Sequence, residues 1–455
     1  MKFREPEIQK YIWEHRDDFF SLIEVPEFET DPNKAPSEYE PWELLYYRML
    51  QKYEESYRSL KGLEFFGCEV GLEKDGESTI RADLLGSLEG DNGLVVCELK
   101  VNRSPERQAY TELLAYANHV RAKLSPMGRR DIFYLLISPM EERIVREATI
   151  NSLIYDRNRV LVLIPEVGET LDTLRFRLWI PPKEKFMIFT KTAFAFENID
   201  VFKISWRGAK GKWSPTKKGK KPNNKMIHQL DKVSHYAAQI MEANGINGFV
   251  FCSQSFPEVR DKGYLENGIA ICGINPFKSA KTRYLFENDC DLKIASDAPI
   301  EALEIENVFP SLKDKSGMSD FHWMSVGWST CLDEIAFDVV AKVNMNLGDA
   351  HYERGYGDFT WGSYLYRSEE DVLCWNYDIS LTGLFREIYD LKLERYYKAA
   401  KDYSDDERIA LVESDELKWH CIDMLYSQNH MRDFIRNLIG YENIEENDPF
   451  DDVLI

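Results

Sequence analysis

Three residues, Asp83, Glu98 and Lys100, have the types and spacing that phosphodiester chemistry requires. The apolar run GLVVCELKV over 93–101 predicts a strand, and because strand side chains alternate between faces, Glu98 and Lys100 share one face. Asp83 lies in the preceding predicted strand, across a short turn. Paired residues of adjacent antiparallel strands lie ~5 Å apart, so Asp83 and Glu98 can converge on one divalent ion.

This set suits phosphodiester hydrolysis, which needs an activated water and neutralisation of charge on the phosphate. Two carboxylates can hold Mg²⁺, a hard ion that prefers oxygen ligands. The ion lowers the pKa of a bound water and polarises the phosphoryl oxygen. A lysine beside the ion can orient the water or stabilise the developing charge.

The elements that would position these residues alternate between helices and strands. Hydrophobic spacing and turn residues predict a helix over 41–60, strands over 63–73, 79–89 and 93–101, a helix over 105–124, a strand over 131–138, a helix over 141–156 and a strand over 159–167. This order predicts a compact mixed α/β unit.

Asp83, fourteen further residues and then Glu98-Leu99-Lys100 form a pattern that resembles the PD-(D/E)xK nuclease superfamily. The sequence pattern DLL…G…LVVCELK…ELLAY is similar to that of its NucS-like and RecB-like branches. The resemblance covers residues 37–168. It implies a restriction-endonuclease-like αβββαβ core that cleaves DNA with Mg²⁺ or Mn²⁺. Asp83 and Glu98 would then be metal ligands together with the backbone carbonyl of Leu99, and Lys100 would be the catalytic lysine.

The resemblance also indicates accessory positions. The branches often carry a QxxxY motif on the next helix, where this chain has Glu112 and Tyr116. Glu112 could supply another metal-facing carboxylate or be an unrelated surface residue. Gln108, one turn earlier, could partly substitute for the missing glutamine, and Glu43 could match an upstream acidic residue.

The ELK tripeptide alone does not identify a site, because the chain contains a second copy. Glu416-Leu417-Lys418 lies in a helical pattern, where its charges are expected to be surface charges. The β-rich run, the upstream Asp83 and the following helix distinguish the first copy. An ordinary ion pair on a solvated strand face is the alternative interpretation of that first copy.

Residues 207–225 form a basic loop with eight Lys or Arg and no acid, in a chain of net charge -21. An acidic protein repels nucleic acid at long range, so a local basic patch would have to bind it. A solvated flexible loop is the alternative. The residues expected to contact nucleic acid, with Trp213 stacking on a base, are Arg207, Lys210, Lys212, Trp213, Lys217, Lys218, Lys220 and Lys221.

The rest of the chain predicts further α+β structure. Strands are expected in LRFRLWI, FMIFTKTAFAF, VFKISW and GFVFCS, with a helix over 225–243, strand-like pieces around 335–345 and 359–377, and mostly helix from Leu381. The expected division is an N-terminal helical segment over 1–36, a nuclease-like domain over 37–168, an α+β domain over 169–310, and a C-terminal domain over 311–455 that becomes mostly helical and ends in an acidic tail.

Composition excludes several classes of protein. With 44% hydrophobic and 30% charged residues, the chain is expected to fold. It shows no signal-peptide pattern and no apolar stretch of membrane-spanning length. Its eight cysteines include no CxxC pair, which favours free thiols in a reducing cytoplasm. Motifs of P-loop NTPases, dinucleotide-binding folds and serine hydrolases are absent.

These observations together predict a cytoplasmic Mg²⁺- or Mn²⁺-dependent nuclease that acts on DNA rather than RNA, in genome defence or repair. The alternative is a nuclease fold without activity that serves as a nucleic-acid-binding or assembly module. In either case a second copy or a partner protein could bind through the C-terminal region, and no membrane partner is expected.

Overall fold

The computed structural model divides the chain into two compact units, and each is considered by itself. The first unit combines Met1–Asn33 with Leu45–Lys185, and the second combines Lys34–Leu44 with Phe186–Ile455. The described residues are 3–32, 34–72, 80–90, 93–102, 108–124, 127, 131–154, 158–206, 224–255, 267–287, 322–342, 351–354, 374–401 and 428–439.

The first unit has the predicted order of one helix, three strands, a helix, a strand, a helix and a strand. Its elements are α1 (Glu5–Glu14), η1 (Arg16–Leu22), α2 (Pro41–Ser59, whose first residues belong to the second unit), η3 (Leu60–Gly62), β1 (Leu63–Leu72), β2 (Ile80–Leu88), β3 (Gly93–Leu99), α4 (Ala109–Lys123), β4 (Ile132–Ile137), α5 (Arg143–Ile154), β5 (Arg159–Glu166), η4 (Leu171–Thr173) and β6 (Arg175–Leu178). The predicted mixed α/β class is confirmed, as is the strand expected in LRFRLWI.

The six strands form one sheet in the order β1-β2-β3-β4-β5-β6. The pairs β1–β2 and β2–β3 are antiparallel, β3–β4 and β4–β5 are parallel, and β5–β6 is antiparallel. Strand β3 therefore has an antiparallel neighbour on one side and a parallel neighbour on the other. The sheet includes β6, which lies beyond residue 168.

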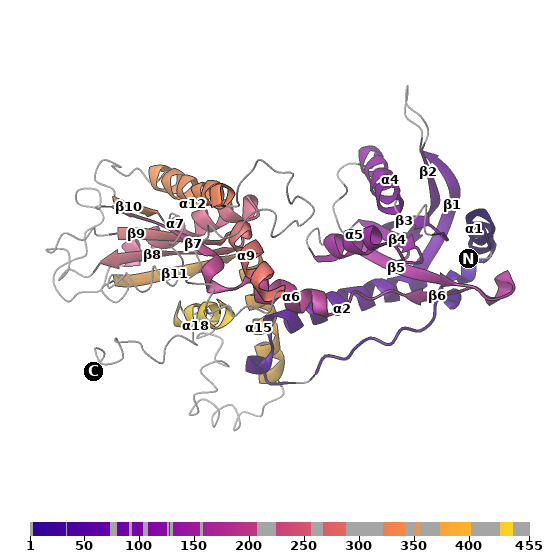
Figure 1. Cartoon of the computed structure of the whole chain (residues 1–455), viewed down its shortest axis with the longest axis horizontal. Coiled ribbons are helices and arrows are strands. Elements are labelled where there is room, and N and C mark those ends of the chain that lie inside the picture. Colours follow the sequence, from indigo (N-terminus) through magenta and orange to yellow (C-terminus); the bar gives the residue numbers. More distant parts are fainter. Residues whose placement is uncertain are drawn as a thin grey trace. The chain divides into compact units, whose positions relative to one another are not determined.

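Helices α4 and α5 cover one face of this sheet (Figure 1). Leu113 and Tyr116 of α4 and Val145 of α5 join Val96 and Val162 in one buried cluster. The opposite face is also buried, because alternate residues of β3 and β4 that point away from α4, such as Cys97 and Leu135, are fully inaccessible. Burial on both faces explains why the parallel strands are continuous apolar runs.

The second unit contains a separate five-stranded antiparallel sheet in the order β10-β7-β9-β8-β11. Its elements are η2 (Pro36–Glu38), α6 (Glu184–Ala193, whose first two residues belong to the first unit), η5 (Phe196–Asn198), β7 (Ile199–Trp206), α7 (Asn224–Ala243), β8 (Gly248–Ser255), β9 (Asn267–Ile274), α9 (Pro276–Glu287), α12 (His322–Lys342), β10 (His351–Arg354), β11 (Cys374–Thr382), α15 (Leu384–Lys401) and α18 (Gln428–Ile439). The sheet takes strands from both of the segments that the sequence divides at residue 310.

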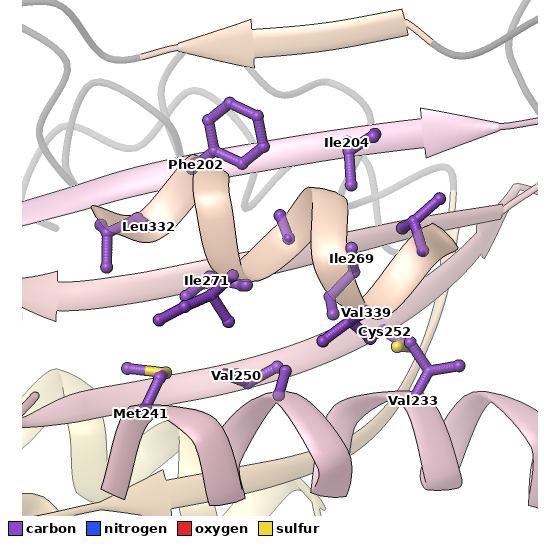
Figure 2. Close-up of a cluster of buried hydrophobic side chains, with 14 of the residues drawn as sticks. Phe202, Ile204, Val233, Met241, Val250, Cys252, Ile269, Ile271, Leu332 and Val339 are labelled. Carbon is purple, nitrogen blue, oxygen red and sulfur yellow. The ribbon is translucent and has the colours of Figure 1, made fainter. Parts of the chain in front are cut away.

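One face of the second sheet packs against α7 and α12. Val233 and Met241 of α7 and Leu332 and Val339 of α12 bury their side chains against strand residues such as Ile271 (Figure 2). On α7 and α12 the buried residues recur at helical spacing, which places one apolar stripe of each helix on the sheet.

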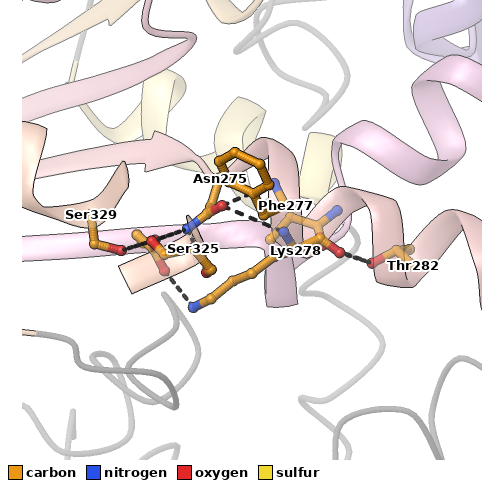
Figure 3. Close-up of polar contacts among 8 residues, drawn as sticks. Asn275, Phe277, Lys278, Thr282, Ser325 and Ser329 are labelled. Atoms are coloured by element: carbon orange, nitrogen blue, oxygen red, sulfur yellow. Dashed lines mark hydrogen bonds and ion pairs between the residues drawn. The ribbon is translucent and has the colours of Figure 1, made fainter. Parts of the chain in front are cut away.

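A buried polar network joins β7, α9 and α12 in the second unit (Figure 3). The Lys278 ammonium pairs with Asp200, which is 1% exposed and also accepts hydrogen bonds from Asn275 at 2.6 Å and Ser329 at 2.5 Å. Asn275 in turn accepts a hydrogen bond from the Phe277 amide at 3.0 Å, at the start of α9. Because each of these polar groups has a partner, the network fixes α9 and α12 on the sheet.

Two of the strand predictions made from the sequence are wrong. Residues 186–193 of FMIFTKTAFAF lie in helix α6, and residues 335–342 lie in helix α12. In α6, the hydroxyls of Thr190 and Thr192 donate to carbonyls four residues earlier, at 3.0 and 2.8 Å, so β-branched residues are accommodated in the helix. The expected helix over 225–243 and the strands in VFKISW and GFVFCS are confirmed. Of the piece expected around 359–377, residues 359–373 lie outside the described residues.

None of the helices within the described ranges is long and apolar enough to cross a membrane. Among the cysteines in the described ranges, Cys97, Cys252 and Cys272 are buried, Cys68 is half-buried and Cys331 is exposed.

Candidate active site

The strands β2 and β3 bring Asp83 and Glu98 to neighbouring positions. Their antiparallel register pairs Leu84 with Cys97, so the next position along it places Asp83 beside Glu98. The Asp83 carboxylate also bonds to this strand directly, because its Oδ2 accepts a hydrogen bond from the backbone amide of Leu99 at 2.7 Å.

Lys100 lies among three carboxylates. Its ammonium forms an ion pair with Oε1 of Glu98, and lies 2.9 Å from Oε2 of Glu112 on α4 and 3.7 Å from Oε1 of Glu5 on α1. Glu98 is inaccessible to solvent and Lys100 is 7% exposed. The face of β3 that carries Glu98 and Lys100 is therefore closed by α4 and α1.

The aspartate of this site ionises less readily than a free one. Burial raises the pKa of the Asp83 carboxyl from its usual 3.8 to about 6, and the carboxylates of Glu5 and Glu69 add to the rise. The hydrogen bond from Leu99 and the charge of Lys100 act in the opposite direction. Asp83 therefore retains a proton to higher pH than an exposed aspartate.

The glutamates and the lysine perturb one another. Burial, with Asp83 and Glu112 close by, raises the pKa of Glu98 well above its usual range. Burial alone would raise the pKa of Glu112, but its contacts with Glu98 and Lys100 lower it. Burial disfavours the charged form of Lys100, yet the carboxylates around it outweigh burial and raise its pKa. Lys100 is therefore positively charged at neutral pH.

Asp83 and Glu98 are candidate ligands for a divalent cation. Oε2 of Glu98 is buried without a hydrogen-bond partner, which is costly unless a cation or water satisfies it. Within the described ranges, no three or more His, Cys, Asp or Glu are grouped so as to hold a metal ion. Mg²⁺ commonly binds through one or two carboxylates and keeps several waters, so Asp83, Glu98 and a backbone oxygen form a suitable ligand set.

Tyr116 and Gln108, the two other accessory residues predicted near Glu112, differ in burial. Tyr116 lies one turn after Glu112 and is 7% exposed, and burial together with Glu98 and Glu112 raises the pKa of its hydroxyl. Gln108 is exposed and its carbonyl accepts the Glu112 amide at 3.0 Å at the start of α4. Whether either residue takes part in catalysis stays a prediction.

Glu43 has partners of its own in the second unit. Both of its carboxylate oxygens lie 2.7 Å from the Lys34 ammonium, and Oε2 accepts the amide of Glu40 at 2.9 Å. These contacts fix the beginning of α2.

Sequence reasoning missed three residues of this site. Glu5 and Gln9 are on α1, where the Gln9 amide donates to the Asp83 carbonyl at 3.1 Å. Glu69 lies in β1 with a φ of 51°, a left-handed conformation that is rare for a residue with a side chain and is often found at functional sites. No local pattern links these residues to Asp83. The buried pair Ile8 and Ile12, four residues apart, was the signal that α1 packs on the core.

Two predictions concern residues outside the described ranges. One is the inert second tripeptide, Glu416-Leu417-Lys418. The other is the nucleic-acid contact of the basic loop through Arg207, Lys210, Lys212, Trp213, Lys217, Lys218, Lys220 and Lys221.

Comparisons with known proteins found no relative: no family model matches the chain, and neither a curated protein nor a solved structure matches it. The residues of the site therefore carry the evidence on function.

Proposed function

We propose that the first unit is a metal-dependent nuclease of the PD-(D/E)xK type, with DNA as its preferred substrate over RNA. The observation that supports it best is the convergence of Asp83, Glu98 and Lys100 beside β3, with one oxygen of Glu98 buried and unsatisfied. A buried acid of this kind is characteristic of sites that bind a cation or transfer protons.

Each residue has a role in this proposal. Asp83 and Glu98 would hold Mg²⁺ or Mn²⁺ together with the Leu99 carbonyl, and the Leu99 amide fixes the Asp83 carboxylate against β3. When bound, the ion would supply a water of lowered pKa and neutralise charge on the phosphate. Lys100 orients that water or stabilises the developing negative charge, and Glu112 keeps the ammonium in place.

The test is incubation of the purified full chain with plasmid DNA, single-stranded DNA and RNA, with and without Mg²⁺ or Mn²⁺. We expect cleavage of DNA only with the metal, and loss of cleavage in Asp83→Ala and Glu98→Ala. Lys100→Ala should raise the barrier by ~2–4 kcal/mol, the cost of losing one electrostatic stabiliser. Asp172→Asn, a change at an exposed residue of the same unit, is the control. Cleavage that survives in Asp83→Ala and Glu98→Ala would contradict the proposal.

A module that binds nucleic acid without cutting it is the second candidate. The contacts of Lys100 argue against catalysis by its ammonium, because carboxylates already surround it. Wild-type protein that binds nucleic acid in the same experiment, but leaves it intact with every metal, would support this candidate.

A further inference from the structure

Helix α1 carries an acidic residue into the candidate site. Ile8 and Ile12 of this helix are fully buried, Gln9 binds the Asp83 carbonyl, and Glu5 in its first turn reaches Lys100. Glu5 therefore contacts Lys100 from an element that precedes the αβββαβ order of the first unit.

The ammonium of Lys100 is surrounded by carboxylates. A lysine has three N–H donors and no acceptor, and Lys100 has three carboxylates within ion-pair distance: Glu98, Glu112 and Glu5. A phosphate anion must compete for this ammonium with the ionised carboxylates around it, because like charges repel.

Glu5 is the carboxylate that can leave at the lowest cost. Glu98 is completely buried, and Glu112 lies 2.9 Å from the ammonium. Glu5 lies farther away, at 3.7 Å, and its side chain is 30% exposed. Accessible ion pairs contribute little to stability, so water can replace this contact readily.

We propose that Glu5 is an internal competitor of the substrate: its carboxylate occupies the place at Lys100 that a phosphodiester anion takes when nucleic acid binds. Glu112 holds Lys100 throughout, and Glu5 turns toward solvent as the phosphate enters. This inference rests on the proposed function, since it assumes that Lys100 meets a phosphate.

The experiment compares Glu5→Gln with Glu14→Gln in the full chain. Glu14 is on the same helix, nine residues further along, where its accessible side chain pairs with Lys10 at 3.6 Å. Both variants remove one negative charge from α1, but only the first removes the contact with Lys100. Each is also made in a Lys100→Met background, and circular dichroism verifies that α1 and the fold persist.

The first measurement is the Kd of a short fluorescein-labelled DNA duplex in EDTA. Glu5→Gln should bind about fivefold more tightly than wild type, which corresponds to about 1 kcal/mol for an accessible ion pair. Glu14→Gln should leave the Kd unchanged, and neither change should matter once Lys100 is methionine. Equal affinities of Glu5→Gln and Glu14→Gln, or weaker binding by Glu5→Gln, would overturn the proposal.

The second measurement does not depend on nucleic acid. Mass spectrometry gives the rate at which an amine-specific reagent acylates Lys100, and this rate should rise in Glu5→Gln only. If wild-type protein neither binds nor cuts any nucleic acid, the proposed function is wrong. The acylation rate then tests only whether Glu5 shields Lys100, and an unchanged rate in Glu5→Gln would show that it does not.

Discussion

The backbone amide of Leu99 donates a hydrogen bond to the carboxylate of Asp83 at 2.7 Å, so the residue between Glu98 and Lys100 is tied to the acid on the next strand. This bond makes the aspartate part of the β2–β3 pairing. It favours the ionised form of Asp83, while burial favours the protonated form and outweighs it.

The raised pKa of Asp83 predicts a pH-dependent stability. Its usual value is 3.8 and its value in the fold is about 6, so the folded state binds more protons than the unfolded state between these values. Stability should therefore fall as pH rises through this window, by at most about 3 kcal/mol. Asp83→Asn carries no charge at any pH and should be more stable than wild type above the window, with little difference below it.

Urea unfolding of wild type and Asp83→Asn, on both sides of the window, measures this difference. Asp172→Asn, at an exposed site, should show the same difference from wild type at both pH values. An Asp83→Asn difference that does not change with pH would mean that burial does not penalise the Asp83 charge.

Glu112 should be required as a hydrogen-bond acceptor for Lys100 and not as a negative charge. Gln can still accept from the ammonium, so Glu112→Gln should keep kcat within about threefold of wild type. Glu112→Leu should lower kcat about tenfold, because it removes the carboxylate that lies 2.9 Å from the ammonium. The control is the same pair of changes at Glu147 on α5, whose side chain is 45% exposed. A Glu112→Gln variant as slow as Glu112→Leu would indicate that the charge itself is needed, as in a metal ligand.

The second ELK tripeptide should be inert. Glu416→Ala should leave nuclease activity unchanged, since the surrounding sequence predicts a helix whose charges face solvent. Cleavage rates on plasmid DNA test this, with the thermal unfolding midpoint as a control for folding. Lost cleavage in a folded Glu416→Ala protein would mean that the second tripeptide is the functional one.

The basic loop should bind the phosphate backbone. Neutralising Lys217, Lys218, Lys220 and Lys221 together should weaken binding to all sequences alike and reduce the slope of log K against log salt by ~1 for each lost contact. A short substrate at saturating concentration should still be cut, because the site on β2 and β3 is intact. Unchanged affinity and salt dependence would indicate that this segment is a solvated linker.

The part of the site that sequence could predict depends on local geometry. Asp83, Glu98 and Lys100 follow from strand alternation and a short turn, and the observed β2–β3 register agrees with both. Glu5 could not be predicted, because its contact depends on how α1 packs on the core. The identity of a distant partner is determined by tertiary packing and leaves no periodic signal in the sequence.

The two wrong strand predictions have a common cause. Both segments are rich in β-branched and aromatic residues, which favour strands only weakly when packing is not considered. In α12 the buried residues recur at helical spacing, a signal that was present in the sequence: Leu332, Ile335, Ala336, Val339 and Val340. The period of burial was therefore a better guide than residue type.

The contacts around β3 differ widely in sequence separation, and this predicts the order in which the site assembles during folding. The Leu99–Asp83 hydrogen bond closes a loop of 16 residues, whereas the Gln9–Asp83 bond joins residues 74 apart. Loop-closure entropy rises with separation, so the β2–β3 hairpin should form early and α1 should dock late. Asp83 and Glu98 would thus meet before Glu5 arrives, and α1 should be the first part of the site to exchange its amide hydrogens in the native protein.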